Sequence, residues 1–512
     1  MKRDTQLVAA LTAVFALRLA AGALLPLSAD EAYYWLWSRH LSAGYFDHPP
    51  AIAFVIRLGT ALFGDTPFGV RVVGILLSFV ASWFVWRAGA ILISDEKAGA
   101  LACLFFNLTL MTAVETLAAT PDSPSIFAAA ALVWALAKVE QKGDGRWWIV
   151  AGAAAGIGLL SKYTALFLGA GAAVWLVACP AMRRWLVSPW PYLSALVAAL
   201  IFLPNLLWNA SHGWASFAFQ FGRVEASRFT LRYLAEFLGA QFLLATPFLF
   251  LLGVMGVAAA DWRDQRRALI GAILWPSIAY FAWHSLHDRV QGNWPCFLYP
   301  LFAIAAADAA LRVDWTAWRA PLARWSARLA VPVAAVLLLA GTAQALLGVV
   351  PMGRKDPLAR LLAVGFPQVV EKVESVRAKA GADAILTSDY ATAAWFAFYG
   401  ASPVVDVGED FRWRDFEPPA PALFGKPALY VTEARRDRQG MIAAGFSSVV
   451  PVAAFDRLRH GVPIAHYVVY RVESPRQGAV GRLLRATPRE HLVLLRFSQT
   501  KDQSWPKTSM PS

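Results

Sequence analysis

The chain has 512 residues, of which 58% are hydrophobic and only 16% are charged, and its mean hydropathy is +0.48. This composition is too apolar for a soluble protein of this length, so the pattern favours an integral membrane protein. The net charge of +13 argues less for nucleic-acid binding than for membrane topology, because cations gather in loops on the cytoplasmic side of membrane proteins.

Apolar runs near the ~20 residues needed to cross a bilayer recur from residue 6 to residue 350. They predict about eleven membrane-spanning helices, and hence an α-helical polytopic fold. The expected helices cover residues 6–28, 67–87, 98–115, 122–140, 146–161, 163–180, 188–207, 232–258, 267–284, 294–311 and 329–350.

Charge bias predicts the orientation. With a cytoplasmic amino terminus, the inside loops contain most of the loop cations, among them the pairs Arg183-Arg184 and Arg266-Arg267. The first apolar run is long and has no small-residue cleavage site before Asp30, so we expect a retained helix. The three cysteines fall within predicted helices, which indicates neither a disulfide framework nor a metal cluster.

The first outside loop concentrates ionisable and aromatic residues directly after the first helix. It contains the strings Asp30-Glu31-Ala32-Tyr33-Tyr34-Trp35 and Tyr45-Phe46-Asp47-His48-Pro49-Pro50. Ionisable groups at a membrane boundary are costly unless they have a role, so this loop is the leading candidate for chemistry.

Three further outside turns carry polar residues that are hard to explain as membrane anchors. They are Thr120-Pro121-Asp122-Ser123-Pro124, Ser161-Lys162-Tyr163 and His287-Asp288-Arg289-Val290-Gln291-Gly292-Asn293-Trp294. We expect these turns to meet the first loop at one membrane face, where carboxylates would mix with cations.

Such a mixture suits the transfer of a sugar from a lipid phosphate to a hydroxyl group, which needs a base for the hydroxyl proton and cations for the departing phosphate. The predicted catalytic residues are Asp30, Glu31 and Asp122, with Asp30 as the base. The predicted phosphate-binding residues are Lys162, Arg289 and His48. The predicted substrate-binding residues are Tyr33, Tyr34, Asp47, Gln291, Asn293 and Trp294.

A divalent ion, Mg²⁺ or Mn²⁺, held by Asp30, Asp47 or Asp122 would share the work of the cations, since hard cations prefer oxygen ligands. Each position also has a structural alternative. Asp122 can cap a helix, Lys162 can extend to the membrane interface, and Glu115 can be solvated. Asp288 can serve only as an ion-pair partner for Arg289.

After residue 350 the apolar runs shorten. Segments 384–388, 403–407, 428–432, 449–453 and 467–472 are typical of strands, and segments 358–378 and 390–399 of helices. We therefore predict a transmembrane catalytic domain at residues 1–350, a periplasmic α/β domain at 351–475 and a basic, disordered tail at 476–512.

The two first-loop strings and the Thr120-Pro121-Asp122-Ser123-Pro124 turn resemble bacterial glycosyltransferases of the protein O-mannosyltransferase-like superfamily. This superfamily has the type C glycosyltransferase (GT-C) fold and includes transferases that add aminoarabinose or galacturonic acid to lipid A. The resemblance covers approximately residues 6–350, including Leu159-Leu160-Ser161-Lys162-Tyr163 and Phe202-Leu203-Pro204-Asn205-Leu206-Leu207-Trp208-Asn209.

The resemblance implies an inverting enzyme of the bacterial inner membrane that uses a polyprenyl-phosphate-sugar donor on the periplasmic face. Asp30 resembles the catalytic acidic residue of the first loop, and Asp122 resembles the second acidic position near the donor phosphate. His48 stands where aminoarabinose transferases have a lysine, which argues against copying their sugar to this chain.

The expected acceptor is lipid A, lipopolysaccharide or another envelope lipid or glycan, with membrane lipids around the protein and no nucleic-acid partner. Two alternatives remain open: a protein O-glycosyltransferase, and a transporter or flippase of lipid-linked sugars. Transport would favour ionisable residues near the bilayer midplane and internal repeats, whereas here the ionisable residues gather at one face.

Overall fold

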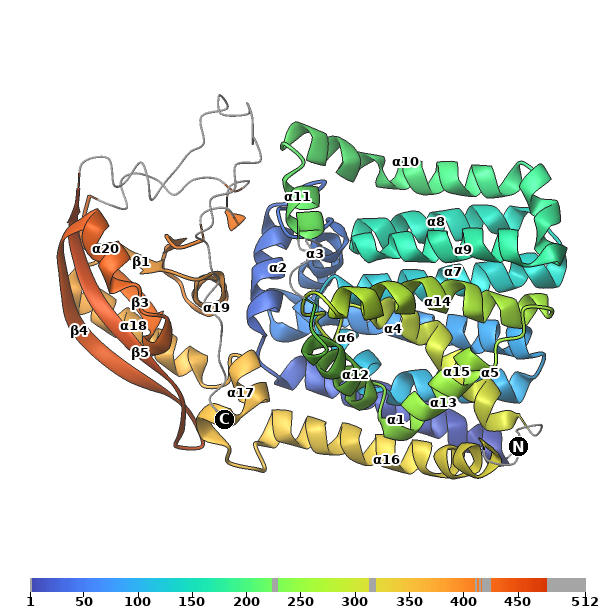
Figure 1. Cartoon of the computed structure of the whole chain (residues 1–512). Coiled ribbons are helices and arrows are strands. Elements are labelled where there is room, and N and C mark those ends of the chain that lie inside the picture. Colours follow the sequence, from blue (N-terminus) through green and yellow to red (C-terminus); the bar gives the residue numbers. More distant parts are fainter. Residues whose placement is uncertain are drawn as a thin grey trace.

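The computed structural model describes residues 2–222, 229–312, 319–409, 412–413, 416 and 425–476. It comprises a bundle of helices and a unit built around one β-sheet, here called the sheet unit (residues 357–475). The sheet unit lies at the end of the bundle opposite the amino terminus (Figure 1). The predicted tail lies outside the described residues from residue 477 onward.

The bundle helices follow most of the predicted segments. Two short helices, α2 (Ala29–Arg39) and α3 (Ala51–Phe63), separate α1 from α4 and were not predicted. The remaining helices before the sheet unit are α1 (Lys2–Leu24), α4 (Pro67–Ile93), α5 (Glu96–Leu108), α6 (Leu110–Glu115), α7 (Asp122–Lys142), α8 (Arg146–Ser161), α9 (Leu166–Ala178), α10 (Trp190–Ser211), α11 (Ala215–Gly222), α12 (Arg232–Leu244), α13 (Pro247–Ala258), α14 (Gln265–Ser285), α15 (Tyr299–Leu311) and α16 (Arg319–Leu347), with 3₁₀ turns η1 (Tyr163–Ala165), η2 (Pro180–Val187), η3 (Cys296–Leu298) and η4 (Gly353–Lys355).

Five helices of the described chain are long and apolar enough to cross a membrane, or up to seven if each bent pair counts as one span. The expected number of about eleven is therefore not confirmed. The prediction of a single helix at 232–258 is wrong, because the chain bends by 108° between α12 and α13. At the break Thr246 has a φ of +67° and Pro247 follows, and a proline disfavours helical geometry at the residue before it.

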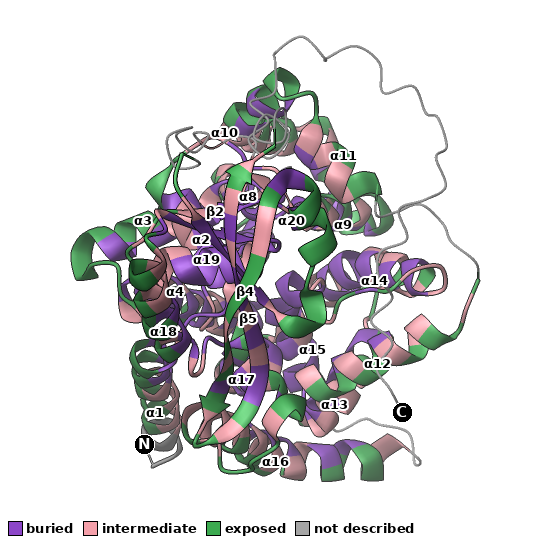
Figure 2. Ribbon diagram, turned by 90° about the vertical axis from the view of Figure 1, so that its left-hand side faces the viewer, coloured by how far each residue is buried: buried purple, intermediate pink, exposed green. Residues whose placement is uncertain are grey.

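The outer faces of the bundle are apolar. On α10, Leu193, Leu196 and Leu200 are spaced along one side of the helix and are exposed. Figure 2 shows exposed residues along α10 and α16 at opposite edges of the bundle. Contiguous apolar surface of this kind would be unfavourable in water and suits lipid contact.

The sheet unit is a mixed five-stranded sheet with strand order β2-β1-β3-β5-β4. β1 runs parallel to β2 and β3, whereas β5 runs antiparallel to β3 and β4. All five predicted strands are confirmed: β1 (Ala384–Thr387), β2 (Val404–Asp406), β3 (Ala428–Glu433), β4 (Phe446–Arg459) and β5 (Val462–Pro475). The helices of the unit are α17 (Pro357–Leu361), α18 (Phe366–Ala380), α19 (Tyr390–Tyr399) and α20 (Gln439–Gly445), with the 3₁₀ turn η7 (Ala434–Arg436).

The sheet unit and the first-loop helices share one hydrophobic core. Trp37 of α2 and Ile56 of α3 belong to the same buried cluster as Phe366, Phe396 and Val469 of the sheet unit. This packing holds the first loop against the sheet unit, so residues from both parts can contribute to one site.

The connection is also hydrogen-bonded at Leu27, directly before α2. The amide of Leu27 donates to Tyr399 Oη at 2.8 Å, and its carbonyl accepts from Trp395 Nε1 at 3.2 Å. Both partners lie on α19, which therefore sits beside the start of α2 (Figure 1).

Candidate active site

Asp30 lies in the first turn of α2, where the sequence Ser28-Ala29-Asp30-Glu31 forms a capping box. The capping box fixes the start of this helix by satisfying its free amide groups. Tyr390 Oη of α19 donates to Asp30 Oδ1 at 2.8 Å. Burial raises the pKa of Asp30 above its ordinary value, while the hydrogen bond from Tyr390 and the charge of Arg412 oppose the shift. Asp30 is thus a carboxylate with enhanced basicity.

The neighbouring Glu31 has a structural role, and its assignment to the catalytic set is corrected. Its side chain is 1% exposed and forms an ion pair with Arg71 of α4, with N–O distances of 2.6 and 2.7 Å. It also accepts from the amides of Ser28 and Ala119. With four donors on two oxygens, this carboxylate has no capacity left for a substrate proton.

Asp47 is held by a network that crosses from the first loop to the sheet unit. Its Oδ2 accepts from Tyr33 Oη at 2.7 Å, and its Oδ1 pairs with the guanidinium of Arg412. That guanidinium also lies over the ring of Tyr390, 4.3 Å from the centroid. Asp47 is 5% exposed, so its carboxylate is covered by protein. We therefore expect Asp47 to position neighbouring side chains and not to contact the substrate.

Tyr390 and Arg412 were not predicted as site residues from the sequence. Each contacts a first-loop residue about 360 positions away in the chain, and no local pattern marks such a contact.

Tyr33 and Tyr34 form part of a packed aromatic cluster, which corrects their assignment as substrate contacts. They are 2% and 7% exposed. Tyr33 makes edge contacts with Trp37, Tyr390 and Trp413. Their rings are covered by protein, and the hydroxyl of Tyr33 donates to Asp47. His48 lies near this cluster, with its ring 6.4 Å from that of Tyr34.

A second centre surrounds Asp122 at the amino end of α7. Lys162 Nζ lies 2.6 Å from Asp122 Oδ1, and the two residues are 8% and 2% exposed. Asn293 Nδ2 donates to Asp122 Oδ2 at 2.7 Å, and Cys296 Sγ donates to Oδ1 at 2.9 Å. The structure therefore brings together predicted residues from three separate turns. Cys296 was not predicted as a site residue, because it lies inside a predicted helix.

The two centres are adjacent. Ala119, three residues before Asp122, donates to the carboxylate of Glu31, which follows Asp30 directly. Glu115 of α6 lies within electrostatic range of Asp122, Lys162 and Asp30. Glu115 was expected to be solvated, but its carboxyl hydrogen-bonds with Asp122 and interacts with the charges of Lys162 and Asp30.

Other predicted residues of this turn contact groups other than the Asp122–Lys162 pair. Arg289 is exposed and pairs with Glu236 of α12 at 2.8 Å, so Asp288 is not its only partner. Gln291 is exposed, and its carbonyl accepts from the amide of Trp294. The Trp294 ring packs 5.6 Å from that of His284.

The predicted metal ligands do not form a cluster. Within the described residues there is no group of three or more His, Cys, Asp or Glu side chains that could hold a metal ion. Asp47 and Asp122 are each paired with a cationic side chain, which already supplies the charge that a metal would supply. The residues present do not fit a divalent ion, so the mechanism below includes no metal step.

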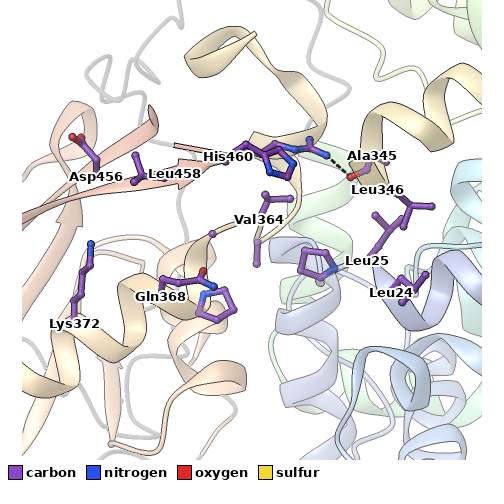
Figure 3. A pocket seen from close by; sticks show the side chains of 15 residues that line it. Leu24, Leu25, Ala345, Leu346, Val364, Gln368, Lys372, Asp456, Leu458 and His460 are labelled. Carbon is purple, nitrogen blue, oxygen red and sulfur yellow. Dashed lines mark hydrogen bonds between the residues drawn. The ribbon is translucent and has the colours of Figure 1, made fainter. Parts of the chain in front are cut away.

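Two cavities lie where the sheet unit meets the bundle. One, of about 210 Å³, is lined by Asp30 together with Tyr390 and residues of the sheet unit. The other, of about 490 Å³, lies between the ends of α1 and α16 and the sheet unit (Figure 3). The larger cavity contains none of the predicted site residues along its lining. The smaller one is the cavity that reaches the base candidate.

Comparisons with known proteins agree with this arrangement. Residues 47–208 match the family model described as dolichyl-phosphate-mannose-protein mannosyltransferase. The chain is 27% identical over 282 residues to the lipid A galacturonosyltransferase RgtD of Rhizobium johnstonii, covering 54% of this chain and 59% of that protein. It is also 27% identical over 273 residues to the undecaprenyl phosphate-alpha-4-amino-4-deoxy-L-arabinose arabinosyl transferase of Pseudomonas paraeruginosa, covering 50% and 44%. The chain thus spans about half the length of these relatives.

The fold has a counterpart among solved structures. The crystal structure of ArnT from Cupriavidus metallidurans bound to undecaprenyl phosphate superimposes with a TM-score of 0.63 and 16% identity. The match covers 92% of this chain and 99% of that protein, so it includes both the bundle and the sheet unit.

Proposed function

Because this chain is a multi-pass membrane protein with the GT-C fold and is related to the lipid A-modifying glycosyltransferases, we propose that it transfers a sugar from a polyprenyl-phosphate donor to lipid A or another envelope lipid. The observation that carries the proposal is the pairing of two adjacent centres. Asp30 is a half-buried carboxylate whose pKa is raised by burial, and Lys162 is a buried cation. These are the two functions that glycosyl transfer from a phosphate requires.

In the proposed reaction, an acceptor oxygen attacks the anomeric carbon of the donor sugar and the bond from that carbon to the phosphate oxygen breaks. Asp30 takes the proton of the attacking hydroxyl. Lys162 stabilises the negative charge on the departing prenyl phosphate. Asp122 holds the ammonium group of Lys162 in place and itself accepts hydrogen bonds from Asn293 and Cys296. Attack opposite to the departing phosphate inverts the anomeric centre.

The active centres face the periplasm in this proposal. The sheet unit and α2, the helix that carries Asp30, lie at the end of the bundle away from the amino terminus (Figure 1). The cation bias of the loops favours a cytoplasmic amino terminus.

We expect Tyr390→Phe to move the acidic limb of the pH–rate profile to higher pH. The base works only when deprotonated, so the rate falls as pH falls through the pKa of Asp30. The hydrogen bond from Tyr390 lowers that pKa, and its loss raises the pKa further. Tyr399→Phe, on the same helix but bonded to Leu27, is the matched control. An unmoved limb in Tyr390→Phe would show that Tyr390 does not tune the base.

Reconstitution with donor and acceptor on the same side of the membrane tests the function as a whole. Product formed under these conditions requires catalysis without translocation, and we expect a product one sugar heavier than the acceptor lipid. A protein that moves labelled donor across the membrane but forms no product would be a transporter. Sugar found on added envelope protein and absent from lipid would favour the protein O-glycosyltransferase alternative.

A further inference from the structure

The cavity beside Asp30 is unusually rich in arginine. Its lining includes four guanidinium groups but only two carboxylates, Asp30 and Glu433. The arginines come from three elements of the sheet unit: Arg360 from α17, Arg435 and Arg436 from η7, and Arg457 from β4. The lining of the cavity therefore carries more positive than negative charge.

Two of these guanidinium groups are balanced by nearby acids. Arg435 pairs with Glu433 at 2.6 Å, and Arg436 pairs with Asp389 at 3.1 Å. Each pair neutralises one guanidinium charge. The other two guanidinium groups of the lining belong to Arg360 and Arg457.

Arg457 is 2% exposed, and its guanidinium donates to the backbone carbonyls of Val364, Ala359 and Leu362. It also lies over the ring of Trp395 at 4.8 Å. Carbonyl oxygens orient this charge without neutralising it, and an arginine inside a protein does not lose its proton. The sheet unit thus maintains a buried positive charge at the edge of the cavity.

Arg360 adds to the excess. Its guanidinium donates to the carbonyl of Arg354 at 3.3 Å. Burial lowers the pKa of Arg360, and the charges of Arg435, Arg436 and Arg457 lower it further, while Glu433 opposes the shift. A bound anion would relieve the repulsion.

We propose that this cavity binds an anionic group of the acceptor, a phosphate or a carboxylate, and holds the acceptor oxygen against Asp30. The inference rests on the proposed function and adds the substrate class and the residues that recognise it. The base must touch the acceptor, since it takes the acceptor's proton, so a cavity lined by Asp30 belongs to the acceptor. Planar guanidinium groups suit the oxygens of a phosphate or carboxylate through paired hydrogen bonds.

The size of the cavity limits what it holds. Its volume of about 210 Å³ is below the roughly 300–1,000 Å³ of sites that enclose a whole small molecule. It fits an ionic head group, with the rest of the acceptor outside. The donor phosphate has a separate place at Lys162, which lies at the end of α8 within the bundle.

The test measures binding of glucosamine 1-phosphate to the full chain in nanodiscs without donor. We expect Arg360→Gln/Arg436→Gln to weaken binding by about tenfold or more, because charge-assisted hydrogen bonds are lost. Arg360→Lys/Arg436→Lys should retain part of the affinity. Arg471→Gln removes the same charge from β5 outside the cavity, where Arg471 pairs with Glu473, and should bind as the wild type does.

Four results would overturn the proposal: equal binding by the Gln double variant, equal weakening by Arg471→Gln, equally tight binding of glucosamine without phosphate, or a loss of binding confined to Lys162→Met. Lys162→Met should retain binding, and a loss confined to that variant would assign the anion to the donor centre. The assay needs no turnover, so it separates this proposal from glycosyl transfer itself. Where transfer is measured, the Gln double variant should raise the KM for the acceptor and leave kcat nearly unchanged.

Discussion

Asp30→Asn is expected to lower kcat by roughly 10²–10⁴, the usual contribution of a positioned general base. The amide retains the size of the carboxylate and can still accept from Tyr390, but it cannot take a proton. The measurement is initial rate with saturating donor and acceptor in reconstituted protein.

Asp65→Asn is the matched control for that prediction. Asp65 is another carboxylate at the sheet end of the bundle, but it is half-exposed and pairs with Arg39 and Trp35. The control should retain nearly full activity and the same melting temperature. Comparable losses in both variants would indicate a general charge effect and would remove Asp30 as the base.

Lys162→Met is expected to have the second largest effect, with kcat reduced by roughly 10²–10³ through loss of a charge that stabilises the departing phosphate. It also leaves Asp122 without its ion-pair partner. Breaking a buried pair on one side costs about 3–5 kcal/mol of stability, so thermal unfolding must be followed beside activity.

The matched control for Lys162→Met is Lys142→Met. Lys142 is an exposed lysine at the other end of α7, and its loss should change neither quantity measurably. Lys162→Arg preserves the cation and should recover part of the rate. A fully active Lys162→Met protein would show that the phosphate is stabilised elsewhere, with Arg289 as the first candidate.

The sequence predicted the parts of the site that lie next to helix ends. Asp30, Asp122 and Lys162 each follow or precede a long apolar run. Successive membrane-spanning helices run in opposite directions, which predicts that these residues gather at one end of the bundle. The capping box at Ser28 and Glu31 was not predicted, and neither was the ion pair from Glu31 to Arg71. That partner comes from a different helix, and this is why Glu31 resembled a catalytic acid.

The contribution of the sheet unit could not be predicted. Its strands were identified correctly from alternating and apolar segments, but their docking depends on the shared core of Trp37, Phe366 and their neighbours. Tyr390 and Arg412 reach the first loop only because of that core. The break before Pro247 had a signal, the Thr246-Pro247 pair, which the long apolar run around it outweighed.

The most direct test of the central claim is mass spectrometry of envelope lipids from cells that express the wild-type chain, no chain, or Asp30→Asn at equal protein level. We predict one lipid species heavier by a single sugar residue in the first strain and absent from the other two. The same species at wild-type abundance in the Asp30→Asn strain would contradict glycosyl transfer with Asp30 as its base.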